Sequence, residues 1–345
     1  MHHRTLGRTG IQVSPYALGA LMFATSMGNT PEESGRLLHR ALDAGINFID
    51  TADAYADSED VVGRALAGRR DEVVLATKFG RPTGPGVNQQ GASRRWIVSA
   101  VEASLRRLRT DYIDLYQLHR PDPATDVEET LAALTDLISS GKVRAIGASG
   151  STAASIVDAQ WVAERRGLAR FHTEQPVYSL LNRGIEREVL PTLQRFGMGT
   201  LVWGPLGQGL LTGRVRKDQG NDLKRGGLLR HVSDESRLDV VEKLIPLAAE
   251  AGLPLSHLAM AFTVAHPGVT SALIGVRTEQ HLDALIDGLD VTLADDVLDR
   301  IDEIVPPGAD IGQLDQAVQP PPLQDPGLRR RPWASRAVTE RKPAA

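Results

Sequence analysis

The chain has 345 residues, a length that suits one large barrel-type domain or two ordinary domains, and its 41% hydrophobic and 24% charged residues are typical of a globular protein. A formal net charge of −4 argues against a nucleic-acid surface, which needs a basic patch, and the absence of cysteine excludes disulfides, thiol catalysis and cysteine-ligated metals. No apolar run has the length of a membrane span or a signal-peptide core, so we expect a cytoplasmic protein without a membrane partner.

Eight apolar runs of strand length predict the β-strands. Most are apolar throughout rather than alternating, which is typical of strands buried on both faces. In chain order they are Val13–Ala20, Asn47–Asp50, Val73–Lys78, Ile113–Leu118, Val143–Gly147, Phe171–Gln175, Thr200–Trp203 and Ala272–Gly275.

Between these runs lie segments whose apolar residues recur every three to four positions, which predicts helices. The segments are Pro31–Ala44, Ser93–Arg109, Asp126–Ser140, Thr152–Arg166, Ile185–Arg195, Ser236–Ala251 and Thr278–Ile286. Strand and helix repeated eight times predict an α/β fold, a closed (β/α)8 TIM barrel, here with a short N-terminal β-hairpin and a C-terminal extension. An open doubly wound sheet is the alternative, and the length and the count of strands favour the barrel.

Two segments interrupt the pattern. Leu206–Glu235 is long, glycine-rich and polar, and we interpret it as an active-site loop after strand seven. Residues 307–345 are rich in proline and end in a basic stretch, so we predict an extension that packs partly on the barrel and is disordered at its end. The predicted barrel domain covers residues 1–306.

Polar side chains follow three neighbouring strands where each apolar run ends. Asp50, Lys78 and His119 stand at these ends, and Tyr55 comes shortly after Asp50. Because adjacent strands lie about 4.8 Å apart and the chemistry of such a barrel sits at its carboxyl end, we expect the four side chains to converge. An ammonium near a phenol favours the phenolate, and Asp50 would hold that ammonium in place. Tyr55 would then be a general acid for a carbonyl oxygen, with His119 donating a hydrogen bond or sharing the proton.

The chain resembles the aldo-keto reductase family over nearly its whole length, to about Pro307. The resemblance rests on seven motifs in order, GINFIDTADAY, LATKFG, DYIDLYQLHRPD, GKVRAIGASG, EQPVYSLLNR, WGPLGQGLLTGR and LIGVRTEQHL. The branch that it resembles is that of bacterial NADPH-dependent reductases with a long loop after strand seven.

The resemblance implies reversible, NADPH-dependent reduction of an aldehyde or ketone, with a small-molecule carbonyl substrate and no metal. Asp50, Tyr55, Lys78 and His119 would be the catalytic tetrad, and Tyr55 the proton donor. Further residues would bind NADPH (NADP+): Ser149 and Gln175 at the carboxamide, Trp203 on the nicotinamide ring, Gly204, Pro205, Leu206, Gly209 and Leu211 along the pyrophosphate, and Gly275, Val276, Arg277 and His281 at the adenosine phosphate. Arg277 lies at a helix start, which suits a phosphate and favours NADPH over NADH.

Three positions depart from the family pattern. Gly150 stands where the family usually has asparagine, and Ala284 and Leu285 stand where it has an acid and an asparagine. These departures bear on cofactor affinity and on the preference for NADPH.

Two other functions stay open. A metal-dependent barrel hydrolase would use Asp50, His119 and His172, but no strand carries the His-x-His pair that is common in such sites. A cofactor-binding regulatory protein with little turnover is the other possibility. The sequence does not indicate the oligomeric state, and we expect the loop Gly80–Ala92 to take part in substrate choice. Asp53 is interpreted as a capping or loop residue outside the site.

Overall fold

The structure is a computed structural model that describes residues 2–217, 234–312, 323, 325–332 and 335. The chain divides into two compact units, residues 1–315 and 316–345. The second unit contains the short helix α12 (Pro326–Arg329). The predicted disorder at residues 336–345 and most of the loop predicted after strand seven, residues 218–233, lie outside the described residues.

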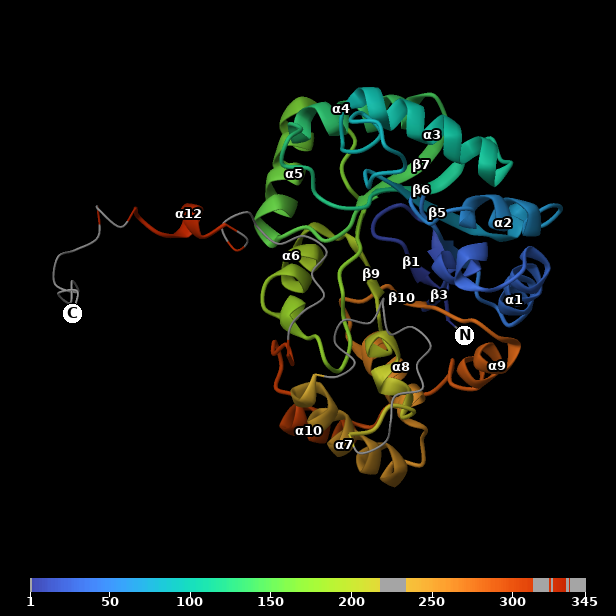
Figure 1. The fold of residues 1–345 in the computed structure, drawn as a ribbon, viewed down its shortest axis with the longest axis vertical. Coiled ribbons are helices and arrows are strands. Elements are labelled where there is room, and N and C mark those ends of the chain that lie inside the picture. Colours follow the sequence, from blue (N-terminus) through green and yellow to red (C-terminus); the bar gives the residue numbers. More distant parts are fainter. Residues whose placement is uncertain (1, 218–233, 313–322, 324, 333–334, 336–345) are drawn as a thin grey trace, which may run out of the picture. The chain divides into compact units, whose positions relative to one another are not determined.

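The first unit is built on a closed barrel of parallel strands, as the sequence predicted, so the open-sheet alternative is wrong (Figure 1). The strands pair in the order β10-β3-β4-β5-β6-β7-β8-β9. Their bounds are Tyr16–Gly19 (β3), Phe48–Asp50 (β4), Val74–Phe79 (β5), Ile113–Leu118 (β6), Val143–Ala148 (β7), Thr173–Glu174 (β8), Gly199–Trp203 (β9) and Ser271–Ile274 (β10).

The first predicted strand, Val13–Ala20, is divided between two sheets. Its start belongs to β2 (Gln12–Val13), which forms the predicted N-terminal hairpin with β1 (Arg4–Thr5). Pro15 has no N–H to give to a strand ladder, and the Ser14 hydroxyl donates to the Tyr16 carbonyl at 2.6 Å. The chain therefore turns here from the hairpin into the barrel.

Helices surround the barrel in Figure 1, and each predicted helix is present within a few residues of its expected bounds. Four α-helices of the described residues were not predicted, namely α2, α8, α10 and α12. Helix α8 is apolar on nearly every side and shows no stripe, and α2 and α12 are short. The helix bounds are Pro31–Asp43 (α1), Ser58–Ala65 (α2), Arg94–Leu108 (α3), Val127–Ser139 (α4), Ala153–Arg166 (α5), Val189–Phe196 (α6), Glu235–Glu250 (α7), Leu255–Ala265 (α8), Glu279–Ile286 (α9) and Asp295–Ile304 (α10).

Within the described ranges, no single helix is both long and apolar enough to cross a membrane. The pair α7 and α8, bent by 92° at its junction, meets the length and composition criteria only when the two are taken together.

Side-chain caps fix where several helices begin. Thr30 accepts from the Glu33 N–H while the Glu33 carboxylate accepts from the Thr30 N–H, a capping box that starts α1 at Pro31. Ser93, the first residue of its predicted segment, caps α3, and Thr278 caps α9. These caps set the first turns of helices that follow the rim of the barrel.

The bore of the barrel has an apolar floor. One inward residue from nearly every strand joins two hairpin residues in a single cluster: Ala17, Phe48, Ala76, Leu115, Ala145, Leu201 and Leu273 with Leu6 and Val13. Leu6 is fully buried, and the hairpin beside it lies so close that a Cβ at Gly7 (φ +56°) would fall 2.5 Å from the His172 carbonyl oxygen. The hairpin thus closes the amino end of the barrel, and the side chains above the floor face the opposite end.

The start of the predicted extension pairs with the segment that follows β8. Arg183 N–H donates to Ala309 at 2.9 Å, and Ile311 N–H donates to Leu181 at 2.9 Å. The domain boundary after residue 306 stays a prediction.

Candidate active site

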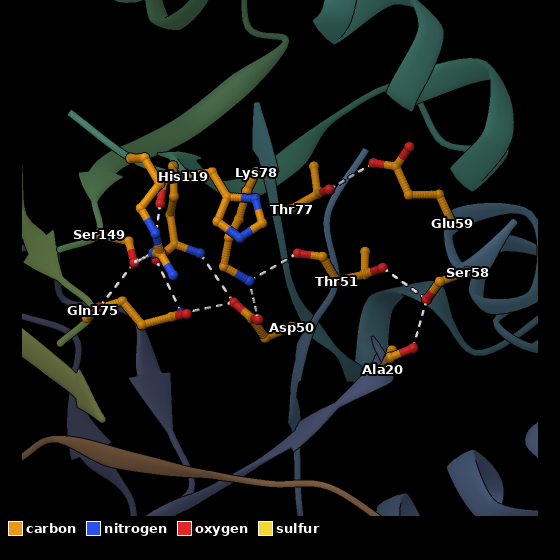
Figure 2. A network of polar contacts seen from close by, with 12 residues as sticks. Ala20, Asp50, Thr51, Ser58, Glu59, Thr77, Lys78, His119, Ser149 and Gln175 are labelled. Carbon is orange, nitrogen blue, oxygen red and sulfur yellow. Dashed lines mark hydrogen bonds and ion pairs between the residues drawn. The ribbon is translucent and has the colours of Figure 1, made fainter. Parts of the chain in front are cut away.

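A buried ion pair stands directly above the apolar floor. Lys78 Nζ contacts Asp50 Oδ1 and donates to the Thr51 carbonyl at 3.0 Å (Figure 2). The second oxygen of Asp50 accepts from Gln117 Nε2 at 3.0 Å and from Gln175 Nε2 at 2.9 Å. The side chains of Lys78 and Asp50 are 1% and 2% exposed. Both charges are therefore paired, and both carboxylate oxygens are satisfied.

Strand periodicity puts these groups into the bore. Side chains alternate between the two faces of a strand, so the residue two positions beyond a floor residue also points inward. Asp50 follows Phe48 in this way, Lys78 follows Ala76, and Lys78 pairs in register with Gln117. Gln117 was missed in the sequence, although a glutamine inside an apolar run is a signal that could have revealed it.

Tyr55 lies over Lys78 and beside His119. Lys78 Nζ is 5.3 Å from the centroid of the Tyr55 ring. The rings of Tyr55 and His119 meet edge to face, with centroids 5.5 Å apart and planes at 81°. Ala56, the next residue in the loop after β4, has φ +49°, which is a left-handed conformation. The four rim residues expected to converge do lie together.

His119 is held as a neutral imidazole. It is 3% exposed, and its pKa is lowered far below the usual value by burial and then by the charges of Lys78, Arg120 and Arg81. Its Nδ1 is buried without a hydrogen-bond partner among the described residues. A neutral ring carries one N–H, so His119 can donate a hydrogen bond to a substrate oxygen but does not act as a cation.

Ser149 and Gln175 lie side by side next to this group. The Ser149 hydroxyl donates to the Gln175 carbonyl at 2.8 Å and accepts from Arg120 NH1 at 3.0 Å. Because the Gln175 NH2 group is engaged by Asp50, it is the amide oxygen of Gln175 that is left to accept from a carboxamide. Arg120 was not singled out in the sequence.

The segment after β9 has an irregular, open backbone. Trp203 is half-buried, and its backbone pairs with Pro176 and Tyr178 after β8. Beyond it, Gly204, Gly207, Gln208 and Gly209 all have positive φ, and a Cβ at Gly204 would meet only Val177, at 3.9 Å. Such a backbone leaves room for a ligand to approach closely.

Two of the predicted cofactor-binding positions in this segment are buried. Leu211 is fully buried in the core, and Pro205 is buried as well. Leu206 is half-buried and packs against the core. The Leu211 side chain packs in the core, and the place of Leu211 along the pyrophosphate stays a prediction.

Basic side chains gather at the start of α9. Arg214 NH1 lies 3.0 Å from His281 Nε2, and Thr278 caps the helix by accepting from the His281 N–H. The Arg277 carbonyl accepts from Asn29 Nδ2 at 2.9 Å, which ties the helix start to the loop before α1. Arg214 was missed in the sequence, although its position at the end of the glycine-rich motif was a signal.

The remaining predicted positions near α9 vary in exposure. Gly275 is exposed and Val276 is 1% exposed. Of the two departures in α9, Ala284 is exposed and Leu285 is 6% exposed in the core. A polar residue at position 285 would therefore lose apolar burial, which explains the leucine in packing terms.

Gly150 adopts φ +76°, a conformation that glycine tolerates best and asparagine next best. A Cβ there would lie 3.6 Å from Cδ and 3.7 Å from NH1 of Arg120. The position where the family pattern has an amide is thus faced by the Arg120 side chain.

A second buried acidic cluster lies behind β5. Glu59 of α2 is 1% exposed, and it accepts from Thr77 Oγ1 at 2.5 Å (Figure 2). It also accepts from Arg107 Nε at 2.7 Å. Asp53 is 8% exposed, and neither of its oxygens meets a partner of normal hydrogen-bond geometry among the described residues. Burial, followed by the Glu59 carboxylate, raises the pKa of Asp53 to about 7. Asp53 is therefore a buried acid that keeps its proton below about pH 7, and it forms no helix cap.

Across the described part of the chain, no group of three histidine and acidic side chains is arranged to hold a metal ion. Asp50, which the hydrolase alternative needs, is already bound by a lysine and two amides.

The chain belongs to the aldo-keto reductase family: residues 16–306 match the model of the Aldo/keto reductase family. It is an oxidoreductase that acts on carbonyl groups, and its family uses nicotinamide cofactors.

Curated relatives match most of the chain. The aldo-keto reductase YhdN of Bacillus subtilis is 38% identical over 296 residues, 83% of this chain and 88% of that protein. Norsolorinic acid reductase stcV of Emericella nidulans is 36% identical over 321 residues, 88% of this chain and 82% of that protein. A probable voltage-gated potassium channel subunit beta of Oryza sativa subsp. japonica is 36% identical over 321 residues, 88% of this chain and 97% of that protein.

Proposed function

We propose that this protein catalyses the reversible, NADPH-dependent reduction of an aldehyde or ketone to an alcohol, with Tyr55 as the proton donor. The observation that carries the proposal is the position of Tyr55 over Lys78 and against the neutral ring of His119. When bound, the nicotinamide supplies a hydride to the carbonyl carbon, and the carbonyl oxygen takes a proton from the protein.

Each member of the tetrad has a separate task. Tyr55 gives its hydroxyl proton to the carbonyl oxygen, and takes it back when an alcohol is oxidised. Lys78 stabilises the phenolate that this transfer leaves, because its ammonium lies against the ring. Asp50 fixes Lys78 and neutralises its charge in the buried site. His119, kept neutral, orients the carbonyl oxygen with its N–H.

The residues around the rim fit a nicotinamide cofactor. Gln175 offers an amide oxygen and Ser149 a hydroxyl at the same place, which suits the carboxamide group. Trp203 offers a half-exposed aromatic face at the end of β9. The open backbone from Gly204 to Gly209 would accommodate the pyrophosphate.

The preference for NADPH would come from the start of α9. Arg277 and Arg214 with His281 bring basic groups to a helix N-terminus, where an extra phosphate is stabilised by charge and by the helix dipole. NADH has no such phosphate, so it would gain nothing from these groups.

The test is a titration with NADPH and NADH followed by tryptophan fluorescence, and then by turnover of benzaldehyde. Saturable quenching that is lost in Trp203→Phe, tighter for NADPH, and equalised between the nucleotides by Arg277→Gln is the expected binding result. Tyr55→Phe should bind NADPH but lose roughly 100- to 10,000-fold in kcat. Tyr112→Phe is the matched control, because Tyr112 stacks on Arg70 and Arg144 at the far end of the strands. Binding of neither nucleotide, or full activity in Tyr55→Phe, would overturn the proposal.

A second candidate function is a cofactor-binding protein that regulates or assembles with another protein. It is favoured by the likeness to the potassium channel subunit beta, which spans 97% of that relative. Saturable binding of NADPH without turnover of any member of a carbonyl panel would support it over the reductase.

A further inference from the structure

Three polar side chains form one layer of the barrel bore, directly above its apolar floor. Asp50 comes from the end of β4, Gln117 from β6 and Gln175 from the end of β8. In an eight-stranded parallel barrel, the side chains of one layer come from alternate strands, and branched apolar residues usually fill them. Gln117 is 0% exposed. A buried amide costs free energy unless its polar atoms are bonded, so the partners of Gln117 indicate its role.

Both polar atoms of the Gln117 amide meet the other two members of this layer. Nε2 donates to Oδ2 of Asp50 at 3.0 Å, and Oε1 lies 3.4 Å from Nε2 of Gln175. Gln175 donates to the same Asp50 oxygen at 2.9 Å. Lys78 contacts the other oxygen, Oδ1. The Gln117 amide therefore links the buried ion pair to the residue proposed to hold the nicotinamide carboxamide.

The neighbouring strand β7 leaves room for the Gln117 side chain. Gln117 pairs in register with Lys78 on one side and with Gly147 on the other. A Cβ at Gly147 would lie 3.3 Å from Cγ of Gln117, closer than side chains normally pack, and it would overlap the Thr173 hydroxyl. Glycine at position 147 therefore keeps free the space beside Gln117.

The Gln117 bond acts on the charge that lies under Tyr55. Asp50 holds Lys78, whose ammonium is 5.3 Å from the centroid of the Tyr55 ring. The N–H of Gln117 is one of two donors that fix the second oxygen of Asp50. Without it, the carboxylate would keep only the Gln175 bond and would be free to turn, and the attached ammonium would move with it. A displacement of about 1 Å can slow a reaction by roughly 100-fold.

We propose that Gln117 is a positioning residue for the proton transfer: its amide fixes Asp50, and through Asp50 it fixes Lys78 under Tyr55. Gln117 itself touches neither the substrate nor the nicotinamide. Because Gln175 has its own bond to Asp50, the transfer step should depend on Gln117 and the binding of NADPH should not. The proposal rests on the proposed reductase function, and it names one further residue of that site.

The first test is Gln117→Met, which nearly keeps the length and volume of the side chain but has no N–H. Stopped-flow absorbance follows the oxidation of bound NADPH by benzaldehyde in a single turnover, and tryptophan quenching gives Kd for NADPH. The single-turnover rate should fall by about 10- to 100-fold, the value of one hydrogen bond to a charged group, while Kd changes by less than about 3-fold. A rate within about 3-fold of wild type, or an equal loss in Kd, would overturn the proposal.

Gln160→Met is the matched control, because Gln160 is also a buried glutamine, 5% exposed. It lies on α5, outside the bore, and its Nε2 donates to the Phe171 carbonyl at 2.8 Å. This variant also loses a buried hydrogen bond, but its single-turnover rate should stay within about 3-fold of wild type. If it were slowed as much as Gln117→Met, a general loss of packing would explain both variants, and the proposal would be overturned.

Gln117→Glu tests the hydrogen bond by rescue. When the introduced carboxyl is protonated, its O–H can donate to Asp50 in place of the amide; when it is ionised, it has no donor and adds a like charge. At about pH 6 this variant should be about 10-fold faster than Gln117→Met, and the advantage should disappear where the carboxyl ionises. A glutamate variant that is no faster than the methionine variant anywhere between about pH 5 and 9 would overturn the proposal.

The same experiments separate the role of Gln117 from the reductase function. If the wild-type protein binds NADPH but oxidises it with no member of a carbonyl panel, the reductase function fails, and the role of Gln117 fails with it. If the wild type is active and Gln117→Met keeps its rate, only the role of Gln117 is wrong. Should Gln117→Met not fold, the rate of Gln117→Glu relative to wild type decides: a ratio that falls with rising pH supports the proposal, and a wild-type rate where the carboxyl is ionised overturns it.

Discussion

Buried acids lie at both faces of β5, and they differ in how completely their charges and hydrogen bonds are satisfied. On the inner face, Lys78 meets one carboxylate, Asp50, whose oxygens also accept from two amides. On the outer face, Thr77 and Arg107 serve Glu59, and Asp53 beside it has no partner of normal geometry among the described residues. The inner cluster is thus balanced in charge and hydrogen bonds, whereas on the outer face two carboxyl groups share one arginine.

The difference separates a site built for chemistry from a cluster built for packing. Full hydrogen bonding fixes Asp50 and Lys78 in one arrangement, which a proton-transfer site needs before the substrate arrives. The outer face instead joins α2 to α3, where Gly63 allows so close an approach that a Cβ would lie 2.5 Å from the Arg107 carbonyl oxygen. There, one proton retained by Asp53 costs less than a second buried charge.

The largest expected effect comes from breaking the inner pair. Lys78→Met should abolish most turnover, by roughly 100-fold or more, because the phenolate of Tyr55 loses its cation. It should also lower the free energy of unfolding by about 3–5 kcal/mol, since Asp50 is left buried without a cation. Lys142→Met, which breaks a half-exposed pair with Glu102, should cost less than about 1 kcal/mol in the same urea titrations. An equal loss of unfolding free energy in the two variants would contradict the expectation that the buried Lys78–Asp50 pair contributes more to stability than the half-exposed pair.

An intermediate effect is expected on the outer face. Arg107→Met removes the cation from the buried Glu59, and should lower the free energy of unfolding by about 3 kcal/mol. Because Glu59 and Arg107 bond on the face of β5 opposite to Lys78, kcat should stay within about 3-fold of wild type. Adding Glu59→Gln should recover part of the stability. A fall in kcat that matches the Lys78 variant would mean that the two faces work as one unit.

The smallest effect is a change in how stability depends on pH. The pKa of Asp53 is raised to about 7 in the folded protein, against about 4 when unfolded, so the protonated acid stabilises the fold most at low pH. This contribution is lost as the pH rises from about 4 to 7. Asp53→Asn cannot ionise, so the wild-type protein should lose about 2 kcal/mol more than the variant between pH 5 and 7.

Urea titrations of both proteins at pH 5, 6, 7 and 8 would measure this difference, and Glu174, which titrates in the same range, is common to both and cancels. Parallel pH profiles would show that Asp53 is ionised throughout and that the outer face has a cation partner after all.

The sequence was most informative where one residue ends an apolar run. Asp50, Lys78 and His119 could be placed at the rim because strands of a parallel barrel end at the same level. Gln117 lies within the strand Ile113–Leu118 and Arg120 just beyond it. Their roles depend on which residue of the neighbouring strand each one faces. The register of the two strands decides this, and the register cannot be derived from the sequence.

The outer cluster could not be read from the sequence for a similar reason. Glu59 stands in the first turn of a short helix, where an acid normally faces water and favours the helix dipole. Its partner Arg107 is 48 positions away, at the end of α3. Asp53 does lie in the loop after β4, as the sequence predicted, but its burial arises only in the folded chain.

The hairpin closes one end of the barrel and the rim with the catalytic residues lies at the other. The two ends therefore differ as places at which the protein can be attached to a surface. A linker joined near Leu6 would leave the rim turned toward the solution, since hairpin and rim lie at opposite ends of the strands. A linker in the loop Gly80–Ala92 would instead stand beside Arg81 and crowd the entrance. An electrode or bead that carries this reductase should therefore hold it by the hairpin end.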